Sequence, residues 1–225
     1  GTDGTIWGGE ILYADYEHFK RLGSIEPFWH VGGDIASKEG FRIAVSIIGG
    51  LMREKEKAKN IIKELELCTE PEANVILTMA QRHLNAIEST SAGRLFDAVS
   101  AILGIQKRST FEGEASMALE FAAEAWQKEH EVKNTENTKN AKNAENVKNA
   151  GNAPNAKNNE NTDAKEQEHI FMQTNAIVWR MIEGRRQGED VGKLAYEFHQ
   201  LLAMEICAAC ENVRTQKKCN QVALS

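Results

Sequence analysis

Residues 90–120, TSAGRLFDAVSAILGIQKRSTFEGEASMALE, predict two helices joined by a loop. Ser91 is placed to cap the first helix, because a serine hydroxyl can accept an N–H of the first turn. Apolar residues recur at helical spacing after it, at positions 95, 96, 99, 102 and 103. Gly104 is placed to end this helix, and the second helix is expected over residues 112–128.

Asp97 is an acid within the apolar part of the first predicted helix. A carboxylate is costly there unless hydrogen-bond donors reach it. The two hydroxyl groups of a ribose could supply such donors, and so could Arg94 or a backbone amide. The spacing alone leaves both a binding role and a structural role open for Asp97.

Residues 6–13 and 19–22 predict two paired strands near the N-terminus, because they are rich in β-forming residues. Gly8 and Gly9 lie inside the first of these strands, where glycine marks a bulge, a turn or the close approach of a ligand. Gly32-Gly33-Asp34 precedes a predicted helix over residues 37–48, which Asp34 or Ser37 could cap. An anion at this helix start is the alternative interpretation.

Residues 133–162 are a three-residue repeat with asparagine at the centre of every unit. This period matches neither a helix nor a strand, and the repeat offers almost nothing to bury. It is therefore predicted to be a disordered loop. Its closure entropy rises only slowly with length, so helices predicted at 112–128 and 165–185 can belong to one fold. Residues 53–66 alternate lysine and glutamate, which is typical of a solvated helix face.

Composition excludes several classes of protein. The formal net charge of −6 over 225 residues gives no basic surface for nucleic acid. No apolar run approaches the roughly 18 residues that a membrane span needs, and the N-terminus is not a signal peptide. Cys207 and Cys210 form a C-x-x-C sequence, but only Cys219 follows, so helix packing is favoured over a zinc site. The six histidines include no i, i+4 pair. A cytoplasmic location is expected.

Four segments together resemble the HypF family of hydrogenase-maturation carbamoyltransferases. They are GTDGTIWGGEILYADYEHFKRLG (1–23), HVGGDIASKEGFRIAVSII (30–48), SAGRLFDAVSAILG with FEGEASMALE (91–104 and 111–120), and KLAYEFHQLLAMEICAACENVRTQKKCNQVALS (193–225). Their order and approximate spacing match the family's C-terminal carbamoyltransferase domain. Any one of these segments alone would be a weak signal.

The resemblance implies an α/β fold, part of a sugar-kinase/actin-like (ribonuclease H-like) ATPase fold, rich in helices. Residues 1–132 and 165–225 would form one carbamoyltransferase domain, interrupted by an insert at 133–164. The family uses carbamoyl phosphate and ATP to make a carbamoyl-adenylate. It then carbamoylates the C-terminal cysteine of its partner HypE during maturation of nickel–iron hydrogenase. Because the family's domain extends beyond both ends of this sequence, we expect an internal fragment that is inactive alone.

The same resemblance implies candidate site residues. Asp97 matches the acid that holds the nucleotide ribose, and Gly113 matches a glycine beside the nucleotide. Gly93 is a third candidate for nucleotide binding. Glycine suits position 113, because a side chain there would block a ligand that lies close to the backbone. Asp3 and Glu10 are candidate acids near a divalent metal whose ligands are expected outside this chain. Zinc is expected only in the family's N-terminal part, and no catalytic residue is assigned.

Two alternatives remain open. One is the related family that transfers threonylcarbamoyl groups to tRNA, and the other is a non-catalytic helical module that binds a partner such as HypE. The sequences of residues 7–10, 93–97 and 112–116 favour the HypF family over the tRNA-modifying one.

Overall fold

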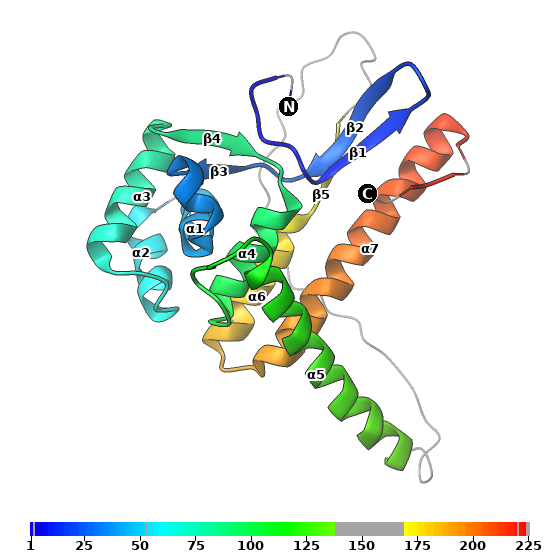
Figure 1. The fold of residues 1–225 in the computed structure, drawn as a ribbon. Coiled ribbons are helices and arrows are strands. Elements are labelled where there is room, and N and C mark those ends of the chain that lie inside the picture. The colour runs from blue at the N-terminus through cyan, green and yellow to red at the C-terminus, as the bar shows by residue number, and fades with distance from the viewer. Residues whose placement is uncertain (2, 53, 138–168, 220, 224–225) are drawn as a thin grey trace.

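The computed structural model describes residues 1, 3–52, 54–137, 169–219 and 221–223. A three-stranded sheet of β1, β2 and β5 lies at one side of the molecule, and helices α1, α2 and α3 gather with a two-stranded sheet, β3 and β4, at another (Figure 1). The helices α4 to α7 extend from the region between the two sheets. The fold is therefore mixed α/β and rich in helices, as predicted.

The predicted N-terminal strand pair is present, but its first strand begins at Glu10 rather than at residue 6, so Gly8 and Gly9 precede the strand instead of lying inside it. Strand β1 (Glu10–Ala14) pairs antiparallel with β2 (Phe19–Ile25), and the register shifts between Ile11 and Leu12. Asp15 forms the turn, since its Oδ1 accepts the backbone N–H groups of residues 17 and 18 at 2.8 and 2.7 Å. An acidic side chain that bonds to nearby backbone amides favours such a turn over continued strand.

Strand β5 (Ile170–Met172) corrects the prediction of one helix over residues 165–185. It pairs in parallel with β2, with Gly23 opposite Ile170. A side chain on Gly23 would lie 2.6 Å from the Ile170 carbonyl oxygen, so only glycine permits this approach. Helix α6 (Thr174–Arg186) begins after the strand. Edge pairing with β2, which local periodicity does not reveal, outweighs helix formation at these three residues.

The second sheet was not predicted, and the capping prediction beside it was wrong. Strand β3 (Phe28–Val31) pairs antiparallel with β4 (Ala86–Ser89). A 3₁₀ turn, η1 (Gly33–Ser37), follows β3, and α1 (Gly40–Leu51) begins only after it. Ser37 donates its hydroxyl to the Asp34 carbonyl at 2.6 Å, so neither Asp34 nor Ser37 caps α1.

Helix α1 is buried on most of its surface, because β3, α3 and α4 surround it. Helix α2 (Lys55–Glu64) agrees with the predicted solvated face at 53–66, and it buries only Ala58, Ile61 and Ile62. Helix α3 (Glu70–Arg82) begins with a capping box between Thr69 and Glu72. Each side chain of this box satisfies a backbone N–H that the first turn leaves unpaired.

Helix α4 (Ala92–Ile102) confirms the central sequence prediction. Ser91 accepts the Arg94 backbone N–H at 3.4 Å, and Gly104 follows the helix with φ of +77°. This left-handed conformation favours glycine. Helix α4 packs on α1, so the residues between Ser91 and Gly104 lie at the centre of the helical part of the fold.

The two longest helices, α5 (Glu114–Asn137) and α7 (Val191–Lys217), pack against each other. The rings of Trp126 and Tyr196 are 5.2 Å apart in this contact. Helix α5 continues through residues 133–137, so the predicted disordered segment was placed to start too early. Residues 138–164 of the predicted insert lie outside the described residues. Within the described part of the chain, each helix is too short or too polar to cross a lipid bilayer.

Candidate functional site

Asp97 lies in α4, where it faces Arg94 and the start of α1. The Asp97 side chain is 6 % exposed, and its Oδ2 lies 3.0 Å from the Arg94 Nη1. Arg94 also donates to the Ser37 carbonyl oxygen at 2.7 Å. Helical geometry brings residues three apart onto one face, so the two charged side chains meet. Arg94 therefore anchors the Asp97 carboxylate to the turn before α1.

The pairing of Asp97 is incomplete. Its Oδ2 has no aligned hydrogen bond from the described residues, although the Arg94 guanidinium is close. Burial raises the pKa of Asp97, and the positive charge of Arg94 opposes that rise. A buried carboxylate oxygen that is left without a donor is costly. Such an oxygen could accept a hydrogen bond from a ligand hydroxyl.

The two candidate glycines lie at helix starts. Gly93 is exposed in the first turn of α4. Gly113 precedes α5 with φ of +83°, and a side chain there would come within 4 Å only of the Ser116 hydroxyl. Both positions leave room for a close ligand. Among the described residues, no hydrogen bond or ion pair connects Asp97 with Gly113.

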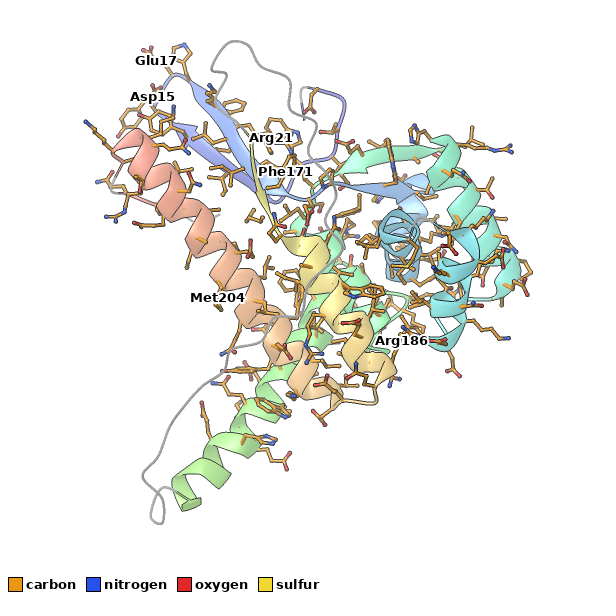
Figure 2. The ribbon with its side chains drawn as sticks, turned by 180° about the vertical axis from the view of Figure 1, so that it is seen from behind. Asp15, Glu17, Arg21, Phe171, Arg186 and Met204 are labelled. Carbon is orange, nitrogen blue, oxygen red and sulfur yellow. The ribbon has the colours of Figure 1, made fainter. Side chains whose placement is uncertain are left out.

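Asp3 and Glu10 are brought together by Arg21 of β2. The Arg21 guanidinium lies 3.1 Å from the Glu10 carboxylate and 3.6 Å from that of Asp3, and it covers the Trp7 ring at 4.6 Å. Hydrogen bonds from Thr5 lower the pKa of Asp3 to about 2. Figure 2 shows Arg21 in the three-stranded sheet, in which Phe171 lies on β5. Arg21 was not predicted as a site residue, because its partner Thr90 lies 69 residues away in the sequence.

The Glu10 carboxylate is the centre of a buried network. Its side chain is 7 % exposed, and Oε2 accepts the backbone N–H groups of Gly8 and Gly9 at 2.5 and 2.9 Å. Oε1 accepts from Arg21 and from the hydroxyl of Thr90, the residue before the Ser91 cap. Glu10 therefore ties the glycine segment, strand β2 and the start of α4 together.

The carboxylates of Asp3 and Glu10 do not fit a metal site. Arg21 already neutralises both acids, and the described residues contain no group of three histidine, cysteine or acidic side chains placed to hold a metal ion. The prediction that metal ligands lie outside this chain stays a prediction. Cys207 is exposed and Cys210 half-buried, and both lie within the continuous helix α7.

A cavity of about 1040 Å³ adjoins the Glu10 network. One part of its wall is formed by Gly8, Gly9 and Glu10 together with Ala92 at the start of α4. The rest comes from all three strands of the sheet, from α7 and from the segment after α7, and it is mostly apolar but includes Arg214 and Gln221. Positive potential at a helix start favours anions. Of the predicted site residues, only Glu10 lines this cavity; Asp97, Gly93 and Gly113 lie outside its walls.

His30 is a further buried polar residue that was not predicted as part of a site. It is buried on β3, and its Nδ1 lacks a hydrogen-bond partner among the described residues. Burial lowers its pKa, and the nearby Arg94 charge lowers it further. The imidazole is thus neutral at pH 7 and lies near the same guanidinium that pairs with Asp97.

The whole chain, residues 1–225, matches the family model described as "Carbamoyltransferase, Kae1-like Domain, second subdomain". It is 38 % identical over 120 residues to the probable carbamoyltransferase HypF of Methanocaldococcus jannaschii, a match that covers 53 % of this chain and 15 % of that protein. It is 40 % identical over 124 residues to carbamoyltransferase HypF of Rhodobacter capsulatus, a match that covers 55 % and 16 %. These matches therefore span about a sixth of each relative.

Solved structures agree on the fold. A full-length HypF in a phosphate- and nucleotide-bound form superposes with a TM-score of 0.73 at 24 % identity, covering 100 % of this chain and 25 % of that one. The HypF of T. kodakarensis superposes with a TM-score of 0.70 at 22 % identity, covering 99 % and 26 %. The predicted α/β fold class, a fragment of the ribonuclease H-like architecture, is confirmed by this likeness.

Proposed function

We propose that this chain, which belongs to the HypF carbamoyltransferase family, forms the nucleotide-holding part of a carbamoyltransferase. The observation that carries the proposal is the buried Asp97 carboxylate, whose Oδ2 lacks an aligned donor among the described residues, inside a segment matched by the family model. A ribose hydroxyl is a donor of the right kind for this oxygen. The solved full-length HypF in a phosphate- and nucleotide-bound form supports this choice of ligand.

In this proposal, Arg94 holds the Asp97 carboxylate in position, and the uncovered glycines 93 and 113 let a nucleotide approach the backbone. A carboxylate that is held by a neighbouring cation loses little freedom when a ligand binds, so the affinity is higher. The Glu10 network keeps the glycine segment against the start of α4. These residues bind and position; the chain offers no assigned nucleophile.

The reaction in which they take part uses carbamoyl phosphate and ATP, with a carbamoyl-adenylate between them. The carbamoyl group is then transferred to the C-terminal cysteine of a HypE-like acceptor in hydrogenase maturation. A divalent metal, held by residues outside this chain, belongs to the same proposal, as does zinc in a separate N-terminal part. We expect the isolated chain to bind nucleotide weakly and to lack turnover.

The test uses the full-length protein, supplied with radiolabelled carbamoyl phosphate, ATP and a HypE-like acceptor. The expected result is label on the acceptor that disappears when its terminal cysteine is replaced by serine. Label that appears instead on tRNA, with threonine supplied, would favour the related tRNA-modifying activity. Binding of the acceptor without any nucleotide-dependent transfer would favour a non-catalytic module.

A further inference from the structure

A second cavity lies apart from the proposed nucleotide site, among helices α1, α2 and α3. It encloses about 240 Å³. Its aromatic and polar lining residues are Trp29, Ser46, Lys55, Gln81 and His83. Successive side chains of a strand point to opposite faces. Trp29 and His30 therefore point away from each other, and the cavity is separated by β3 from the Arg94 and Asp97 pair.

The walls favour a flat, apolar group. The Trp29 ring stacks on the His83 imidazole at 4.0 Å with an interplanar angle of 26°. Helices α2 and α3 add alanine and leucine side chains. Gly50 at the end of α1 leaves space open, because an added Cβ would meet no heavy atom within 4 Å.

Two polar groups that line this cavity indicate which polar atoms a ligand would carry. The Ser46 hydroxyl is buried, in a residue 3 % exposed, and has no hydrogen-bond partner among the described residues. Buried hydroxyl groups are normally paired, so an unpaired one calls for an explanation. Lys55 also lines the cavity, and its Nζ donates to the Thr78 hydroxyl at 3.2 Å. The lining that the described residues form contains no carboxylate, so the positive charge of Lys55 is not neutralised there.

We propose that this cavity binds a small planar carboxylate, a one-ring aromatic acid whose ring lies beside Trp29 and whose carboxylate pairs with Lys55. The Ser46 hydroxyl would bond to a polar atom of the ligand. The volume supports a single ring, since drug-sized ligands occupy pockets of roughly 300–1,000 Å³. The acids nearest along α2 do not compete, because Glu54 pairs with Lys57 and Glu56 with Lys59.

The experiment uses the full-length protein with benzoate as the probe and saturation-transfer NMR as the readout, and benzamide serves as the neutral comparison. We expect saturable benzoate binding that is at least tenfold tighter than that of benzamide. Lys55→Met should weaken benzoate binding at least tenfold, whereas Lys63→Met, on the same helix but outside the cavity, should leave it within twofold. Gly50→Leu should abolish binding by filling the space.

Each other outcome counts against the proposal. It is overturned by the absence of saturable binding, by equal affinity for benzamide, or by an unchanged affinity in Lys55→Met. A crystal soaked with benzoate that shows only a water molecule on Ser46 overturns it as well. Lys55 is exposed, so its variant should fold even if Gly50→Leu does not. Binding that persists in Asp97→Asn distinguishes this cavity from the proposed nucleotide site.

Discussion

The Nη2 atom of Arg21 lies 3.1 Å from the Oε1 atom of Glu10, and the same nitrogen donates to the Thr90 hydroxyl at 3.0 Å. One guanidinium therefore joins two neighbouring strands to the residue that precedes the α4 cap. The Glu10 side chain is 7 % exposed, and its carboxylate accepts hydrogen bonds from this partner and from the amides of Gly8 and Gly9. The contact between Arg21 and Glu10 therefore holds one wall of the 1040 Å³ cavity in place.

Replacing Arg21 with methionine should therefore destabilise the chain substantially. Removal of one partner from a buried ion pair leaves the other charge uncompensated, which costs about 3 kcal/mol. Urea unfolding followed by circular dichroism measures the change. Lys20→Met is the matched control, because Lys20 is the exposed neighbour on the same strand and should change stability by less than about 0.5 kcal/mol. Similar costs for both variants would contradict a central role for the Arg21 contact.

Asp97→Asn should weaken ATP binding by the full-length protein about tenfold, which corresponds to about 1.4 kcal/mol. An amide is uncharged, so it holds a ribose hydroxyl less strongly than a carboxylate does. Isothermal titration calorimetry gives the affinity, and a thermal melt should show little change. Asp34→Asn removes an exposed acid from the nearby turn and should leave ATP affinity unchanged. A large loss of stability with unchanged affinity would instead assign Asp97 a structural role.

The pH dependence of stability provides a separate check on Asp97. Burial raises its pKa above the ordinary value of 3.8, so the folded chain keeps this proton at a pH where the unfolded chain has lost it. The stabilisation from the bound proton is complete below pH 3.8 and is lost as pH rises through the higher, folded-state pKa. The stability of the parent relative to Asp97→Asn should therefore fall as pH increases over this window. A difference that is flat or rises with pH would contradict the direction of the shift.

Gly40→Ala should destabilise α1 at its first residue. A Cβ there would lie 2.7 Å from the Asp97 carbonyl oxygen and 3.0 Å from the Asp97 Cβ, so α1 and α4 would have to separate. Overpacking of this kind costs about 1–3 kcal/mol. In the same helix, Gly50→Ala meets no atom within 4 Å and should stabilise by about 0.5–1 kcal/mol. Chemical denaturation should show that the free energy of unfolding falls in Gly40→Ala and rises in Gly50→Ala. Equal changes in the two variants would contradict close packing at Gly40.

Cys68 should react much more slowly with iodoacetamide than Cys207. Burial raises the pKa of the Cys68 thiol to about 11, so only about one thousandth of it is ionised at pH 8. Cys207 is exposed on α7. Mass spectrometry of timed reactions at about pH 8 should show at least a tenfold difference in rate. The difference should vanish in denaturant, and similar rates in the folded chain would contradict the burial of Cys68.

Local patterns in the sequence predicted the elements that are determined locally. The Ser91 cap, the apolar spacing of α4 and the glycine after it each act within a few residues, and so does the turn between β1 and β2. Strand β5 and the β3–β4 pair depend on partners that are distant along the chain. Three or four residues carry no periodicity strong enough to identify such strands.

Some residues of the candidate site could likewise be predicted from the sequence, and others could not. Asp97 stands out because a carboxylate in an apolar helix face is locally anomalous. The roles of Arg21 and Thr90 emerge only when residues 69 positions apart meet. Glu10 was assigned to a metal environment by family resemblance, yet its oxygens accept hydrogen bonds from the glycine amides, Arg21 and Thr90. Spacing along the chain does not contain that information.

The parallel pairing of β2 with β5 sets an order of events during protein synthesis. Ser24 of β2 bonds to His169, which is 145 residues later in the chain. At the usual rates of translation, about 5–20 residues per second, the ribosome needs roughly 7–30 s to add these residues. The same interval separates the emergence of β2 from that of β5, so the Gly23–Ile25 edge is unpaired during it, and such an edge can pair with another nascent chain. The long connection therefore leaves this edge of β2 open to such contacts until β5 is made.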